Sequence, residues 1–127
     1  MLKDPTKIYL ETRATSSISV ATPHQLIDIL FEALLESLAK AKGAMQRGEV
    51  KEKAEAVKKS LDIIVRLQAS LDFDKGGAIA VQLDELYTFC TNKLALANAL
   101  NNTENIDDVY KAIAEIRRGW ADIKGVT

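Results

Sequence analysis

The sequence predicts an all-α protein, an antiparallel up-down four-helix bundle with an N-terminal arm or short extra helix. Both prolines, Pro5 and Pro23, lie within the first 23 residues, so no residue that breaks a helix interior follows them. Apolar residues then recur with the three-four spacing that is typical of a helix face. Short polar segments separate four such stretches, and short connections between helices of matched length favour an antiparallel bundle.

The first helix is expected from about Pro23 to Arg47. Thr22 is a favoured N-cap residue, and Pro23 suits the first helical position because its missing N–H needs no partner there. Gly48 can adopt the left-handed conformation that ends many helices. Apolar residues cover more than half of the circumference of this helix, so we expect it to be the most buried of the four.

Three further helices are expected along the rest of the chain. The second spans about residues 49–71, and the polar, glycine-containing stretch 72–77 should form a loop, with Lys75-Gly76-Gly77 as a helix-entry turn. The third spans about residues 78–101, and Asn105 can cap the fourth. The predicted inward stripe of the third helix consists of Ile79, Leu83, Leu86, Cys90, Leu94 and Ala97.

The chain divides at the start of the first helix. Residues 1–21 form the predicted arm or cap, because the stretch from Thr12 to Ser19 is polar and lacks helical periodicity. A short turn of helix is expected near Ile8 and Tyr9. Residues 22–127 form the predicted helical-bundle domain.

The composition excludes several classes of protein. Lys and Arg number 17 against 18 Asp and Glu, which argues against nucleic-acid binding because that function needs a basic excess. One cysteine and one histidine exclude a disulfide framework and a Cys- or His-rich metal site. No apolar run approaches the ~20 residues of a membrane span, and the N-terminus lacks a signal-peptide pattern. We therefore expect a cytoplasmic protein without membrane insertion.

Individual polar residues give no sign of catalysis, and we expect neither a cofactor nor a metal. His24 is interpreted as an exposed polar residue in the first turn of a helix. Asp28, Glu32 and Glu36 repeat every four residues, which indicates a solvated helix face rather than a pair of catalytic carboxylates. Cys90 is interpreted as a core thiol, and Trp120 as a core anchor near the end of the last helix.

Some apolar residues of the second and third helices lie outside the main stripes. A four-helix core does not need them, so either a fifth element covers them or they form an exposed groove for a partner helix. The residues of this candidate groove are Ile63, Leu67, Phe89, Leu96 and Leu100. Pattern alone therefore favours a binding protein over an enzyme.

Three motifs resemble flagellar secretion chaperones of the FliS family. The bundle entry reads Val20-Ala21-Thr22-Pro23, followed by Gln25-Leu26-Ile27 and Leu30-Phe31. The third helix begins Gly76-Gly77-Ala78-Ile79-Ala80 and continues with Leu83, Leu86-Tyr87, Leu94 and Ala97-Asn98. The last helix carries Val109, Ile113, Ile116-Arg117 and Trp120. The motifs occur in the family's order and cover nearly the whole chain.

This resemblance implies a helical bundle that binds the disordered C-terminal region of flagellin in the cytoplasm, prevents premature polymerisation and holds it for flagellar type III secretion. It implies no catalysis and no cofactor. The family's N-terminal segment can cover part of the apolar surface until the client displaces it, which makes Ile8 and Tyr9 candidates for a displaceable arm. We expect a monomer or a weak homodimer.

Three alternatives remain open on the sequence. The chain could be a sibling of the family, a co-chaperone or regulator that binds another flagellar protein or an export component; departures at Val20 and Phe31, and a longer arm, allow this. It could be an enzyme or a ligand-binding bundle, which would need polar residues on the core stripes. It could also be a self-assembling structural bundle that buries the same surplus surface against itself.

Overall fold

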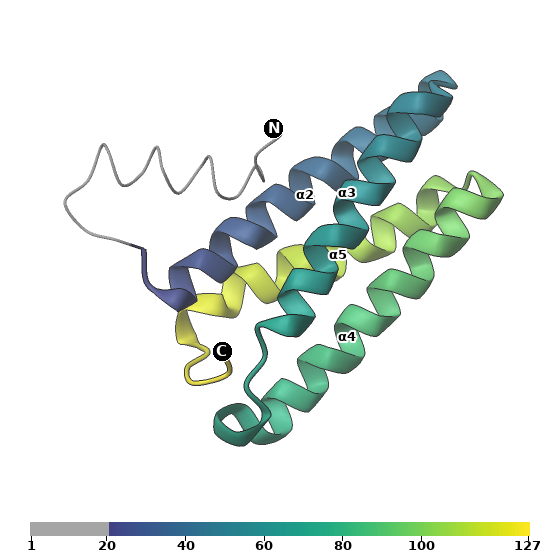
Figure 1. Cartoon of the computed structure of the whole chain (residues 1–127). Coiled ribbons are helices and arrows are strands. Elements are labelled where there is room, and N and C mark those ends of the chain that lie inside the picture. Colours follow the sequence, from purple (N-terminus) through teal and green to yellow (C-terminus); the bar gives the residue numbers. More distant parts are fainter. Residues whose placement is uncertain (1–20) are drawn as a thin grey trace.

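The computed structural model describes residues 21–127 and shows four helices followed by a short 3-10 turn (Figure 1). The helices are α2 (Pro23–Arg47), α3 (Val50–Ala69), α4 (Phe73–Leu100) and α5 (Thr103–Gly119), and the turn η1 spans Trp120–Asp122. Helix α2 packs against α3 and α5, and α4 packs against the same two helices. Each helix therefore lies beside its neighbours in the sequence, and the predicted antiparallel four-helix bundle is confirmed. The predicted arm lies outside the described residues.

Helix α2 has the limits that its sequence predicts. The Thr22 hydroxyl accepts a hydrogen bond from the Gln25 N–H at 3.1 Å, and the Gln25 side chain accepts one from the Thr22 N–H at 2.8 Å. This reciprocal capping box satisfies two amides that the helix leaves without partners. Gly48 ends the helix at φ 69°. Ten residues of α2 are buried, more than in any other helix described, which confirms the prediction for this helix.

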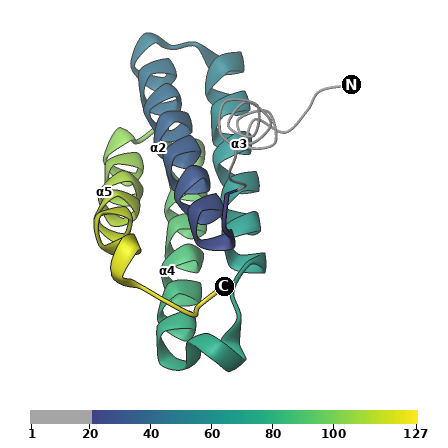
Figure 2. The same cartoon turned by 90° about the vertical axis from the view of Figure 1, so that its left-hand side faces the viewer.

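The start of α4 differs from the prediction. The stretch expected as a loop contains a helical turn, because the Asp72 carboxylate caps it by accepting from the Lys75 N–H at 2.9 Å. Gly77, at φ 50° and ψ −126°, then kinks the helix before its long second part. Ile79 follows the kink and is 45% exposed rather than buried. Figure 2 shows that the first turns of α4 extend past the end of α5.

The connection between α4 and α5 is also shorter than predicted. Asn101 adopts the left-handed conformation at φ 53° and ends α4, while the side chain of Asn102 accepts from the Glu104 N–H at 2.8 Å and caps α5. Of two consecutive asparagines, the first thus ends α4 and the second caps α5. The prediction that Asn105 is the cap is wrong, because the helix has already begun at Thr103.

The core runs the length of the bundle. The largest side chains that are fully buried in it are Tyr87, Phe31, Leu34, Leu38, Ile64 and Leu67. Cys90 is buried, as predicted, and Trp120 is buried at the end of α5. In the described part of the chain, none of the helices is long and apolar enough to span a membrane.

Candidate partner-binding surface

Exposed apolar side chains concentrate on α4. Of the nine large hydrophobic residues exposed between residues 21 and 127, six belong to this helix. They are Phe73, Ile79, Val81, Phe89, Leu96 and Leu100. Apolar residues on the outer side of a helix are normally covered by a neighbour, but α4 contacts α3 and α5 and leaves its remaining face uncovered among the residues described.

The second half of α4 has two distinct apolar faces. Tyr87, Cys90, Leu94 and Ala97 are buried at spacings of three, four and three residues, so they form one inward seam. Phe89, Leu96 and Leu100 are 42%, 48% and 65% exposed. Because their spacings of seven and four residues also keep one face, they form a second, outward row, which we call the α4 stripe.

Polar contacts on both sides hold α4 in this rotation. Toward α5, the Lys93 ammonium pairs with the Asp108 carboxylate at 3.3 Å. The same ammonium lies 5.6 Å from the centre of the Phe89 ring, within the range of a cation–π contact. Toward α3, the Gln68 side-chain amide donates to the Asp84 carboxylate at 3.1 Å. With both edges fixed, the α4 stripe keeps its outward orientation.

Two residues of the predicted groove are not on this surface. Ile63 is 6% exposed and Leu67 is fully buried, which corrects the expectation that they line an open groove. They continue a seam on α3 that begins with Ala56 and Ser60, at spacings of four, three and four residues. The Ser37 hydroxyl of α2 donates to the Ala56 carbonyl at 2.9 Å, so this seam faces α2.

The spacing of this α3 seam is visible in the sequence but easy to miss. Its N-terminal half consists of Ala56 and Ser60, and a serine is not counted as apolar in a search for helical periodicity. In the structure Ser60 is nonetheless fully buried, since its hydroxyl donates to the Ser37 hydroxyl at 2.9 Å. Buried hydroxyls are tolerated when they find such partners. Ile8 and Tyr9, the predicted displaceable arm, lie outside the described residues.

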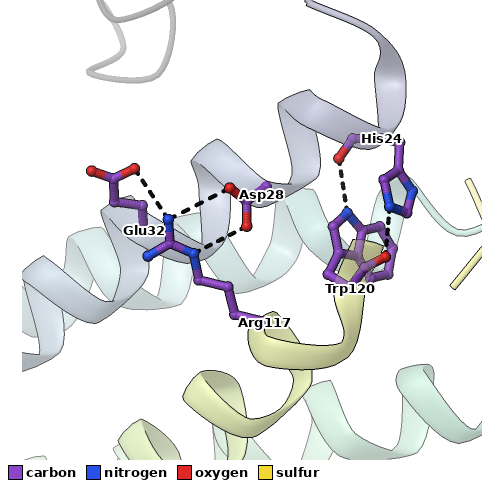
Figure 3. Close-up of polar contacts among 5 residues, drawn as sticks. All are labelled: His24, Asp28, Glu32, Arg117 and Trp120. Atoms are coloured by element: carbon purple, nitrogen blue, oxygen red, sulfur yellow. Dashed lines mark hydrogen bonds and ion pairs between the residues drawn. The ribbon is translucent and has the colours of Figure 1, made fainter. Parts of the chain in front are cut away.

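His24 is not the exposed residue that its position predicted. Its ring stacks on Trp120 with centroids 4.4 Å apart and planes 5° from parallel. The ring Nε2 lies 2.6 Å from the Trp120 carbonyl; because a carbonyl only accepts, Nε2 carries the hydrogen. The Trp120 indole N–H in turn donates to the His24 carbonyl at 2.8 Å. Figure 3 shows how this pair joins the start of α2 to η1.

Beside the aromatic pair, a cluster of charged side chains joins α5 to α2. The Arg117 guanidinium of α5 contacts the Asp28 carboxylate at 3.0 Å and the Glu32 carboxylate at 3.4 Å, both on α2 (Figure 3). The expectation of a purely solvated acidic face is therefore wrong for Asp28 and Glu32. Glu36 is exposed, as predicted. These contacts hold α5 against α2.

Two titratable groups of α4, Cys90 and Tyr87, lie inside the core. Burial raises the pKa of the Cys90 thiol to about 12, so the thiol stays protonated and poorly nucleophilic. Burial, with a smaller effect from Cys90, also raises the pKa of Tyr87 above its usual range. Among residues 21–127, no three His, Cys, Asp or Glu side chains come together to hold a metal ion. The candidate binding surface of the described residues is therefore the apolar α4 stripe.

Comparison with known proteins agrees with this arrangement. The family model described as "Flagellar protein FliS" matches residues 6–126. The chain belongs to the FliS family. Its relatives include the flagellar secretion chaperone FliS of Vibrio cholerae, which is 38% identical over 91% of this chain and 85% of the relative. The flagellar secretion chaperone FliSB of Pseudomonas aeruginosa is 38% identical over 92% of this chain and 93% of its own length.

A third relative extends the comparison. The flagellar secretion chaperone FliS of Salmonella typhimurium is 36% identical over 92% of this chain and 87% of the relative. The curated relatives are thus matched over most of their length, and their names share one role, that of secretion chaperone for the flagellum. The resemblance seen in the three sequence motifs is confirmed as family membership.

Proposed function

We propose that this protein is a cytoplasmic export chaperone that binds the C-terminal segment of flagellin, prevents its premature polymerisation and holds it for flagellar type III secretion. The α4 stripe is the observation that supports the proposal most directly. A row of exposed apolar side chains along one helix suits an amphipathic helix of a partner, which anchors through residues at matching spacing. The names of the relatives supply the flagellar context.

The physical role of the stripe follows from the state of the client. A disordered segment that folds on binding loses conformational entropy and must bury enough apolar surface to offset that cost. Phe89 and Leu100, the two ends of the stripe, lie 11 positions apart on α4, or ~16 Å along the helix axis. A client helix of about three turns would cover them. Covering the client's own apolar face in this way removes the surface through which it would polymerise. The proposal includes no catalytic step and no cofactor.

The experiment is a calorimetric titration of the full chain with a peptide from the C-terminal region of flagellin. Leu96→Glu should weaken binding by at least about tenfold, because a charge replaces a side chain that the client would desolvate. Val50→Glu is the matched control, since Val50 is 75% exposed at the first position of α3. Circular dichroism should show unchanged helicity for both variants.

The outcomes separate the candidate functions. If Leu96→Glu binds the peptide with wild-type affinity, the client site does not lie on the α4 stripe. No binding of the flagellin peptide by the wild-type chain would instead favour the co-chaperone or regulator. Gel filtration with and without peptide tests self-assembly, because a homodimer formed through the α4 stripe would dissociate as the client binds.

The same titration tests the arm that the sequence predicts. We propose that residues 1–21, through Ile8 and Tyr9, compete with the client for apolar surface. A chain that begins at Thr22 should then bind the flagellin peptide more tightly or faster. Unchanged or lost binding in a truncated chain of normal helicity would contradict the competition.

A further inference from the structure

A short segment after η1 closes one end of the bundle. Residues Ile123–Thr127, which we call the strap, run from the end of α5 to the corner between α3 and α4, where Figures 1 and 2 both place the C-terminus. The Asp72 N–H donates to the Val126 carbonyl at 2.8 Å. The Val126 side chain is 1% exposed and belongs to the core.

Val126 lies directly on the backbone of Gly76. A Cβ at position 76 would come within 3.0 Å of the Val126 Cα and 3.1 Å of its Cγ1. Only a residue without a side chain leaves this space, so Gly76 forms the floor of a socket that Val126 fills. Gly125, at φ 71°, supplies the backbone turn that directs Val126 into it.

The strap also forms one wall of a neighbouring groove. Thr127 lines a groove of about 300 Å³ together with residues from the start of α2 and the end of α3. The other lining residues are Pro23, Leu26, Ile27, Leu30, Arg66 and Ser70. The α2 side of this groove is entirely apolar. Removal of the strap would therefore join the socket of Val126 to an existing apolar groove.

We propose that the strap is displaceable, and that an apolar segment of a partner polypeptide, with a valine-sized side chain after a turn, occupies the joined site when the strap is open. The strap is held by the buried Val126, the partly buried Ile123 and one main-chain hydrogen bond to another element, while Lys124 and Gly125 are exposed. The gain from burying these two side chains is opposed by the conformational entropy lost on fixing the strap.

The strap itself indicates what the site accepts. Ile123 has an extended backbone, at φ −90° and ψ 121°, the chain turns at Gly125, and the residue after the turn presents a carbonyl to the Asp72 N–H and a small branched side chain to Gly76. A partner segment in the same conformation, with valine or a side chain of similar size, reproduces these contacts. Ala80, beside the socket, precedes Phe89 by nine residues, or ~14 Å along α4. The joined site is therefore distinct from the α4 stripe and does not depend on the proposed client.

The first test is native-state hydrogen exchange of the full chain, followed at the Asp72 amide. If the strap opens locally, this amide exchanges at least about tenfold faster than amides in the middle of α4, with little dependence on added denaturant. Val126→Ser should accelerate exchange at Asp72 further, without changing the amides of the α4 interior. Lys124→Ala, an exposed change on the same strap, is the matched control.

The second test uses a synthetic peptide with the sequence of residues 122–127. Added to the Val126→Ser protein, it should slow exchange at Asp72 in a saturable way, whereas the same peptide with serine in place of valine should not. Exchange at Asp72 that follows global unfolding in the wild-type protein would overturn the displaceable strap, even if Val126→Ser fails to fold. Equal protection by both peptides would overturn the apolar specificity of the site.

Discussion

Cys90 and Tyr87 lie one helical turn apart on the buried seam of α4, and burial raises the pKa of both side chains. Burial raises the pKa of the Cys90 thiol from its usual value near 9.0 to about 12, and it also raises the pKa of Tyr87. In the unfolded chain both groups titrate at their ordinary values. Between about pH 9 and pH 12 the unfolded state therefore loses a thiol proton that the folded state retains, and the free energy of unfolding falls as pH rises.

The slope of this fall gives a test at a single residue. One retained proton corresponds to about 1.4 kcal/mol per pH unit. Cys90→Ala should therefore flatten the decline in unfolding free energy between pH 9 and pH 11 by about this amount, although lost packing lowers its stability at pH 7. Guanidinium unfolding at pH 7, 9, 10 and 11 measures both effects. An identical alkaline slope in the two proteins would mean that the thiol is not protected by burial.

Single residues also show where sequence reasoning ends. Cys90 and Trp120 were predicted to be buried because each lies on an apolar stripe of its own helix, and burial of both is confirmed. His24 was predicted to be exposed, and this is wrong, because its partner Trp120 lies 96 residues away in the sequence. Helical periodicity describes neighbours within one helix and carries no information about such distant pairs.

At the scale of the element, the kink in α4 depends on the backbone of Gly77. Its combination of φ 50° and ψ −126° is strained for any residue with a Cβ. Apart from the adjoining residues and the nearby backbone of the helix itself, no heavy atom lies within 4 Å of the position where a Cβ would stand, so the cost of a side chain comes from the local backbone. Gly119 is equally open, but its φ of −94° is ordinary.

This difference makes a matched pair of substitutions. Gly77→Ala should lower the free energy of unfolding by about 1–3 kcal/mol, whereas Gly119→Ala should leave it unchanged or raise it by up to about 1 kcal/mol. Chemical denaturation of the two variants measures both values. Equal effects at the two positions would show that Gly77 is not required for its backbone conformation.

Element limits were predicted well where capping signals are unambiguous and less well where they compete. Thr22, Pro23 and Gly48 fix α2 because each has one favourable role. Between α4 and α5, three asparagines occur within five residues, and any of them can cap a helix or take a left-handed turn. The choice of Asn102 over Asn105 depends on how far α5 must extend to pack against α2 and α4, which local sequence does not specify.

At the scale of the whole molecule, the question is which apolar residues hold the bundle together and which remain available to a partner. The sequence identified the surplus apolar residues outside the main stripes, and Phe89, Leu96 and Leu100 are exposed, as expected for a surface. Ile63 and Leu67 are not, because they belong to the seam through which α3 packs against α2. How a helix is rotated between two neighbours is a property of the assembled bundle.

This division predicts opposite behaviour for two leucines of the groove first inferred from sequence. Leu67→Ala should lower the free energy of unfolding by about 2–5 kcal/mol, because it leaves a cavity in a fully buried site. Leu96→Ala should change stability by less than about 0.5 kcal/mol, since nearly half of its side chain is already exposed.

Chemical denaturation gives both stabilities, and titration with the flagellin peptide gives the affinity of the folded protein. Leu67→Ala should retain wild-type affinity after correction for the folded fraction, whereas Leu96→Ala should bind more weakly. If Leu67→Ala instead lost affinity at full stability, α3 would belong to the client surface, and the boundary between core and binding face would have to move from α4 toward α3.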